Sequence, residues 1–230
     1  ALDELEKFGI VPIVPLSHYD CPFELIKRFT GWEYRTMIAL FTRSCDILFE
    51  RYKDRVKYWI TFNEINVLTF ENAHSLMSGG GVLDTKNKDL KQVSYQVLHH
   101  QFVASATVVK LGKSINPKFE FGCMIAQLTA YPNNPDPKNI LLVQDFDLRS
   151  NQFCADVQIF GEYPFYIKSY FETWYDFYFD DKFELIREMY FEGNRRKDIY
   201  AQDILVQYVR ILEGYHLRIT NDEEVASTLD

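Results

Sequence analysis

"KYWITFNEIN", Lys57 to Asn66, decides the fold, because an apolar and aromatic run of strand length ends abruptly at the polar pair Asn63-Glu64. In parallel α/β folds the loops after the strands converge on one face and carry the functional residues. The pair therefore predicts either a capped strand end or part of a catalytic site.

Two further apolar runs, residues 10–17 and 119–126, have strand length, and residues 32–54 and 90–115 show helical periodicity between the three runs. The order strand, helix, strand, helix, strand predicts a parallel sheet with right-handed crossovers. The sequence thus predicts the α/β class.

The first run, "IVPIVPLS", is unbroken and apolar, as expected for a parallel strand covered on both faces. Pro12 and Pro15 argue against a central position in a sheet, since each lacks a backbone donor. The later segment "SGGG", residues 78–81, lacks the Lys-Ser/Thr of a phosphate-binding loop and predicts a flexible loop on the active face.

The two ends of the chain read as interrupted elements. Residues 2–9 predict the last turns of a helix stopped by Gly9, and Thr220 or Asn221 predicts the N-cap of a helix that follows. A proline-rich loop at 132–137 precedes predicted helices at 139–161 and 164–174, beyond which no convincing strand occurs. We therefore expect residues 1–230 to form a single domain cut from a larger parallel architecture.

Composition excludes several classes of protein. The charge, 25 basic minus 33 acidic residues or −8, comes without the basic tract that binds nucleic acid. No apolar run approaches the ~18 residues of a membrane span. The four scattered cysteines predict buried thiols in a reducing compartment, and we expect a soluble, cytoplasmic protein.

His18, Tyr19 and Asp20 follow the first strand as Asn63 and Glu64 follow the second. Adjacent strands lie about 5 Å apart, so both tips can line one pocket. Partial burial can raise the pKa of Glu64 and make it a general acid. Alternatively, Glu64 caps the next element, Asn63 bonds a turn, and His18 is a structural histidine.

No histidine pattern has metal-ligand spacing, and we expect neither a metal nor another cofactor. His99 and His100 are neighbours in a predicted helix, so their side chains point in different directions and cannot share a metal ion. We expect both to be solvated or packed.

Seven motifs occur in a distinctive order along the chain: "PLSHYDCP", "TGW", "YWITFNEIN", "GGGVL", "YQVLHHQFVASATVVKL", "INPKFEFGCMIA" and "DVQIFGEYPFYIKSYF". With these motifs, residues 1–172 resemble the middle of a family 1 glycoside hydrolase, most closely the bacterial 6-phospho-β-glucosidases, and we expect residues 173–230 to form a divergent helical segment. The resemblance implies a partial (β/α)8 TIM barrel, about strands three to five with their helices.

The family resemblance also implies a retaining mechanism with two carboxylates about 5 to 5.5 Å apart. It assigns the general acid/base to Glu64, a bond to the sugar 2-hydroxyl to Asn63, a sugar-hydroxyl contact to His18, and a pocket wall to Tyr19. The "TENG"-like nucleophile motif is absent. Glu192 lies in "FEGN", in a charged helical stretch with no strand before it, and we assign it no catalytic role.

Three interpretations follow. The first is a cytoplasmic glycosidase cleaving 6-phospho-β-glucosides or related sugars, of which this chain is the central portion and inactive alone. The second is a non-catalytic sugar-binding or assembly remnant, whose open sheet edges favour a homo-oligomer or a complementing chain. The third is a rebuilt hydrolase with its second carboxylate within residues 176–192.

Overall fold

Three short strands, β1 (Ile13–Pro15), β2 (Tyr58–Ile60) and β3 (Glu120–Gly122), form a parallel sheet in chain order. The α/β class and the parallel order were predicted from the alternation of strand and helix patterns, and both are confirmed. Each strand is shorter than the apolar run that contains it. The computed structural model describes residues 1–170, so the predicted helices beyond residue 170, the N-cap at Thr220 or Asn221, and Glu192 lie outside the described residues.

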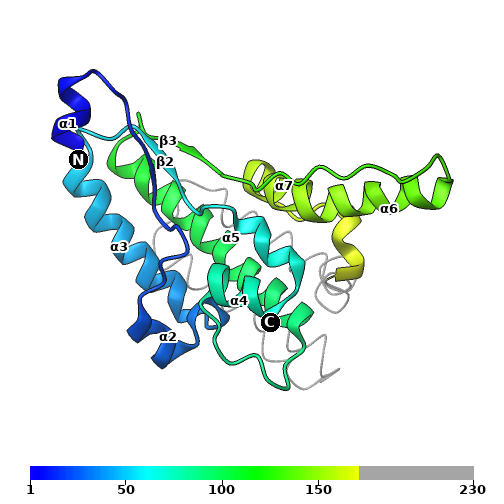
Figure 1. Ribbon diagram of the computed structural model, residues 1–230. Coiled ribbons are helices and arrows are strands. Elements are labelled where there is room, and N and C mark those ends of the chain that lie inside the picture. Colours follow the sequence, from blue (N-terminus) through cyan, green and yellow to red (C-terminus); the bar gives the residue numbers. More distant parts are fainter. Residues whose placement is uncertain (171–230) are drawn as a thin grey trace, which may run out of the picture. The chain divides into compact units, whose positions relative to one another are not determined.

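Helices occupy most of the described chain (Figure 1). They are α1 (Leu2–Lys7), α2 (Phe23–Phe29), η1 (Gly31–Glu33), α3 (Thr36–Tyr52), η2 (Ile65–Phe70), α4 (Ala73–Gly80), α5 (Leu90–Ile115), α6 (Pro137–Asp147), η3 (Leu148–Gln152), α7 (Phe153–Phe160) and η4 (Phe165–Tyr170). Gly9 has a φ of 64° just after α1, as predicted for a residue that stops a helix.

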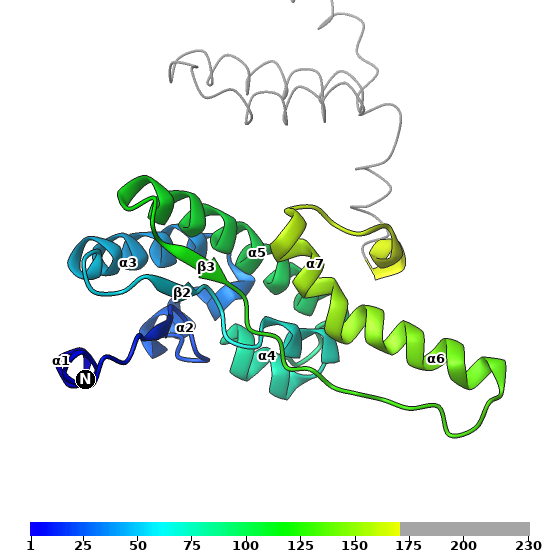
Figure 2. The same ribbon diagram turned by 90° about the horizontal axis from the view of Figure 1, so that it is seen from above.

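α3 and α5 lie side by side along one face of the sheet (Figures 1 and 2). Their contact with the strands is apolar and aromatic, and its fully enclosed members are Cys45, Phe49, Val56, Trp59, Val108 and Phe119. The Phe49 ring meets the Trp59 ring edge-on, with 5.1 Å between centroids. This packing fixes the direction of β2 and therefore the place where its carboxyl end emerges.

The prediction that residues 10–17 are covered on both faces is wrong for the described part of the chain. Ile10, Val11 and Ile13 are 52%, 63% and 63% exposed. β1 lies at one edge of the sheet and pairs with β2. An edge position also explains the prolines, because a strand with an unpaired side tolerates residues that lack a donor.

The prediction of a flexible loop at "SGGG" is also wrong. Residues 78–80 form the last turn of α4, and Gly81, with a φ of 66°, ends the helix. A Cβ on Gly31 would lie only 2.3 Å from the Gly80 carbonyl oxygen. The glycines therefore allow two backbone segments to touch, and this contact holds the turn in place.

Residues 139–161, predicted as one helix, form three joined segments, because the π-helical turn η3 separates α6 from α7. All four cysteines are free: Cys45 and Cys154 are buried as predicted, whereas Cys21 and Cys123 are only half-buried. Among residues 1–170, no helix combines the length and apolarity needed to cross a membrane.

Candidate active site

The carboxyl ends of β1 and β2 stay paired beyond the strands themselves. The Leu16 N–H donates to the Ile60 carbonyl at 2.7 Å, and the Asn63 N–H donates to the Ser17 carbonyl at 3.0 Å. These two bonds hold the loop after β1 beside the residues that follow β2.

Tyr19 and Glu64 meet at this edge of the sheet. The Tyr19 hydroxyl donates to Glu64 Oε2 at 2.6 Å. Both residues have left-handed backbones, with φ of 63° and 47°. Such conformations cost about 1–3 kcal/mol each outside glycine and persist only where the surroundings enforce them. The chain thus accepts strain at both residues, and both contribute to this hydrogen bond.

Tyr19 remains a hydrogen-bond donor through the physiological pH range. Its pKa is raised above the usual value, first by partial burial and then by the bond to the Glu64 carboxylate, while a bond with Asn63 acts in the opposite direction. The sequence predicted only a pocket wall at Tyr19. Strand-tip proximity alone could not identify the phenol as a partner of Glu64.

The hypothesis that Glu64 caps the following element is not supported. Glu64 occupies the N-cap position of η2, but its side chain makes no capping hydrogen bond. The carboxylate is half-buried and points to Tyr19 instead. Its position at a strand tip therefore serves something other than helix capping.

His18 is exposed, so it is no packed core histidine. Its ring lies 5.6 Å from the Tyr19 ring, at 60°. Asp20 shapes this loop, since its Oδ1 accepts the His18 N–H at 2.8 Å. Asn63 is 7% exposed and lies below the rim. The structure thus gathers the sequence-predicted residues at one edge, with His18 and Tyr19 outermost.

A sequence model described as glycosyl hydrolase family 1 matches residues 1–196. This chain belongs to glycosyl hydrolase family 1. It is 42% identical over 170 residues to a 6-phospho-β-glucosidase of Clostridium longisporum, covering 74% of this chain and 35% of that protein. It is also 39% identical over 181 residues to the aryl-phospho-β-D-glucosidase BglA of Bacillus subtilis, covering 78% and 38%.

Solved structures of family 1 enzymes resemble the chain as well. A β-glucosidase from Thermotoga maritima in complex with glucoimidazole has a TM-score of 0.63 at 25% identity, over 76% of this chain and 38% of that one. The psychrophilic β-glucosidase BglU from Micrococcus antarcticus has a TM-score of 0.61 at 28% identity, over 73% and 34%. The chain thus spans little more than a third of the length of these relatives.

Two buried asparagines hold the segment that follows β3 in this family 1 chain. Asn66 Oδ1 accepts the Ala126 N–H at 2.9 Å, and its Nδ2 donates to the carbonyls of Ala126 at 2.9 Å and Ser150 at 2.6 Å. Asn151 binds the N–H and C=O of Leu128 in the same way, at 3.0 and 2.7 Å. Sequence reasoning missed both, since their partners are far away along the chain.

His99 and His100 are packed in α5, as predicted. His100 Nδ1 lies 2.9 Å from the Trp32 carbonyl, which can only accept, so Nδ1 carries the proton and Nε2 accepts from Gln96 at 2.8 Å. His99 Nδ1 lies 2.9 Å from the Tyr163 hydroxyl. Within residues 1–170, no cluster of three or more His, Cys, Asp or Glu side chains could hold a metal ion.

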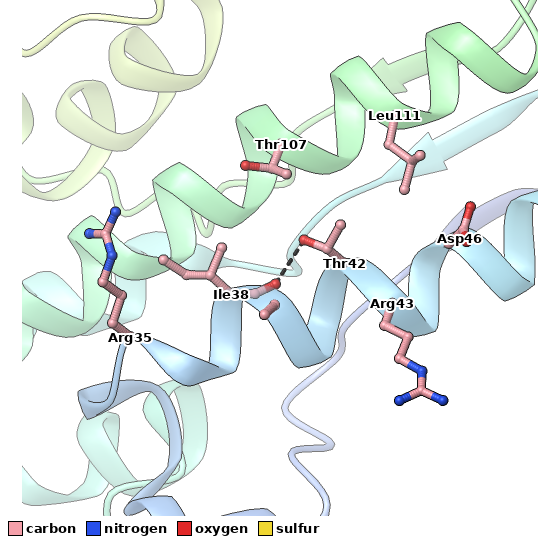
Figure 3. A pocket seen from close by; sticks show the side chains of 8 residues that line it. Arg35, Ile38, Thr42, Arg43, Asp46, Thr107 and Leu111 are labelled. Carbon is pink, nitrogen blue, oxygen red and sulfur yellow. Dashed lines mark hydrogen bonds between the residues drawn. The ribbon is translucent and has the colours of Figure 1, made fainter. Parts of the chain in front are cut away.

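An open groove of about 570 Å³ lies between α3 and α5 (Figure 3). Its lining residues are Arg35, Ile38, Ala39, Thr42, Arg43, Asp46, Thr107 and Leu111. Thr42 turns its hydroxyl inward to the Ile38 carbonyl, at 2.7 Å. None of the lining residues follows a strand, so the groove is separate from the Tyr19–Glu64 pair and takes no part in the candidate site.

Proposed function

We propose that Glu64 is the general acid/base of a retaining glycosidase that cleaves 6-phospho-β-glucosides. The observation that carries the proposal is the Tyr19–Glu64 hydrogen bond of 2.6 Å at the carboxyl ends of β1 and β2 in a family 1 chain. The names of the relatives, 6-phospho-β-glucosidase and aryl-phospho-β-D-glucosidase, support the substrate class.

In the proposed reaction, a second carboxylate attacks the anomeric carbon while protonated Glu64 gives its proton to the glycosidic oxygen, so the aglycone leaves and a glycosyl-enzyme forms. The Glu64 carboxylate then removes a proton from water, which attacks the anomeric carbon and displaces the second carboxylate. Asn63 binds the sugar 2-hydroxyl and His18 a further hydroxyl. Tyr19 borders the sugar and fixes the Glu64 carboxylate through its phenol.

The proposed reaction also needs a nucleophile, and no "TENG"-like motif occurs in the 230 residues. The matched relatives are nearly three times longer than the part that this chain covers, which supports a nucleophile on elements outside it. We therefore expect the 230-residue chain alone to leave p-nitrophenyl 6-phospho-β-D-glucopyranoside intact. Turnover above background that disappears in Glu64→Gln would contradict this expectation.

A chimera tests the role of Glu64. Residues 1–170 replace the matching part of the Clostridium longisporum 6-phospho-β-glucosidase, and Glu64→Gln is compared with the unchanged chimera. Loss of a general acid costs about 10²–10⁴-fold for an alkyl leaving group, which needs protonation. The release of p-nitrophenolate, which leaves unprotonated, should slow less.

Equal loss for alkyl and p-nitrophenyl substrates would argue against acid catalysis by Glu64. A conservative control is Glu71→Gln, at the other end of η2 from Glu64. It should leave the leaving-group dependence unchanged. Substrates with and without the 6-phosphate, tested side by side on the chimera, check the proposed substrate class.

Exposed apolar residues in β1 and just before it favour a second candidate, a non-catalytic assembly protein completed by another copy or a complementing chain. Ile10, Val11 and Ile13 would be covered by such a partner. Sedimentation of the 230-residue chain with and without a Val11→Lys substitution tests this: a larger species that disappears in the variant favours assembly. The third candidate, a carboxylate within residues 176–192, lies outside the described residues, and cytoplasmic localisation stays a prediction.

A further inference from the structure

We propose that Asn66 is a positioning residue for Glu64: its buried amide ties the turn that carries Glu64 to the segment after β3, and so keeps the carboxylate on Tyr19. That this position matters for catalysis rests on the proposed function. That Asn66 holds Glu64 in place can be tested without measuring activity.

The backbone at Glu64 needs such an anchor. Glu64 has a φ of 47°, which side-chain sterics disfavour, and its carbonyl accepts the Val67 N–H at 3.0 Å to start η2. The Glu64 side chain contributes no cap to that turn. The Asn63 N–H bond to the Ser17 carbonyl holds the turn on its N-terminal side. Contacts along η2 hold it on the other side, where Asn66 is two residues from Glu64.

Asn66 is fixed at both its side chain and its main chain. The residue is 0% exposed, and its amide makes three hydrogen bonds of 2.6–2.9 Å. Its carbonyl accepts the Thr69 hydroxyl at 2.8 Å. Because a buried amide left without partners costs about 1–3 kcal/mol, η2 has few alternative positions.

The pattern of these bonds is specific to an amide. Oδ1 accepts the Ala126 N–H while Nδ2 donates to the Ala126 carbonyl, which is how a neighbouring strand would bind that residue. An aspartate would place a carboxylate against two carbonyl oxygens, and a leucine would leave all three partners unpaired. An amide side chain therefore suits this link between η2 and the segment after β3.

Asn151 provides a matched control. It binds Leu128, two residues further along the same segment, through the same two kinds of bond, and it is 3% exposed. It belongs to η3 and not to the turn that carries Glu64. Asn66→Ala and Asn151→Ala thus remove equivalent amides, but only the first removes the link to Glu64.

The test uses the 230-residue chain labelled with [13Cζ]tyrosine. Tyr19→Phe identifies the Tyr19 resonance, and Glu64→Gln gives its position when the carboxylate partner is lost. We expect Asn66→Ala to move the Tyr19 resonance most of the way to the Glu64→Gln position. Asn151→Ala should leave it at the wild-type position, although urea unfolding shows a similar loss of stability for both variants.

A second pair of variants guards against misfolding of Asn66→Ala. Ala126→Pro removes the N–H that Asn66 accepts and keeps Asn66, and Leu128→Pro does the same for Asn151. We expect only Ala126→Pro to move the Tyr19 resonance. An unmoved resonance in Asn66→Ala or in folded Ala126→Pro, or equal movement in the Asn151 and Leu128 variants, would overturn the proposal.

The test of Asn66 can fail or succeed independently of the proposed catalytic role of Glu64. If Glu64→Gln leaves the chimera fully active while Asn66→Ala still moves the Tyr19 resonance, Asn66 positions a side chain that is not the acid/base. If both results are positive, Asn66→Ala in the chimera should lower kcat more than it raises KM.

Discussion

The two halves of α5 differ in the side chains that they bury. The first half, up to Ser105, buries polar side chains among its apolar ones, namely Ser94, His100, Gln101 and Ser105. The second half presents Val108 and Gly112 to aromatic rings, and a Cβ on Gly112 would lie 2.4 Å from the Phe121 ring. Since α5 runs antiparallel to β2, its polar half borders the strand ends that carry Glu64.

The apolar and the polar contacts of α5 contribute differently to the stability of the fold and to the position of the candidate active site. Apolar contacts tolerate small shifts, because dispersion and burial have little directionality. Buried hydroxyls and amides fix positions, because each unpaired polar group costs free energy. We therefore expect the aromatic cluster beneath the second half of α5 to contribute strongly to the free energy of unfolding, and the buried polar groups of the first half to hold the candidate active site in place. Three substitutions test this difference.

The largest effect is expected for Phe49→Ala, beneath the second half of α5. Phe49 is 0% exposed and contacts the rings of Trp59, Phe119 and Phe121. Its loss should lower the free energy of unfolding by about 3–5 kcal/mol, measured by urea titration. Ile47→Ala, at a position 61% exposed on α3, the helix that also carries Phe49, should lower the free energy of unfolding far less. Similar losses for both variants would refute the assignment of stability to this cluster.

The second effect depends on pH and belongs to the first half of α5. Burial, and then electrostatic interactions with His100 and Arg35, lower the pKa of His99 to about 4, while the bond to Tyr163 holds its ring. The unfolded chain binds this proton near pH 6.5, so stability should fall by about 2–3 kcal/mol as pH drops from 6.5 to 4. Below pH 4 this contribution is constant.

Urea unfolding between pH 4 and 7 measures the difference between wild type and His99→Gln. That difference should diminish toward acid pH. His74→Gln, at an exposed position on α4, provides the comparison and should show no such trend. A constant difference for His99→Gln would mean that His99 binds its proton over the same pH range in the folded and the unfolded protein.

The smallest effect is expected for the hydroxyl pair that joins α5 to the residue after β2. Ser105 Oγ donates to Thr61 Oγ1 at 2.8 Å, and both residues are buried. Ser105→Ala should cost about 1 kcal/mol, and the double variant with Thr61→Val less than the sum of the single changes. Thr107→Ala, exposed on the same helix, should be close to neutral; additive costs would show that the pair is not coupled.

The sequence allowed prediction of elements whose signal is local. The bounds of α5 were predicted at residues 90–115 from a long and regular apolar periodicity, and in the structure the Asp89 side chain caps the first turn. Gly9 was predicted to stop a helix because glycine just after a helical pattern is also a local signal. The exposure of Ile13 could not be predicted, since burial of a strand depends on which neighbours it has, and a pattern of apolar residues does not contain that information.

The candidate site was predictable as a place but not as a set of bonds. Polar residues after two strands predicted that Tyr19 and Glu64 lie at one edge, because parallel strands have a fixed spacing. Their hydrogen bond depends on left-handed backbones at both residues, which no local motif specifies. Asn66 and Ala126 are sixty positions apart, so their contact emerges only from the packed structure.

The side chains of Asn66 and Asn151, which bind the segment after β3, determine which substitutions that segment can accept. Both amides hold main-chain groups of Ala126 and Leu128 and contact neither side chain through these bonds. These bonds therefore survive any substitution that keeps the backbone N–H. The exposed side chains at Met124, Gln127 and Leu128 can change, proline excepted, while the backbone bonds that support Glu64 remain.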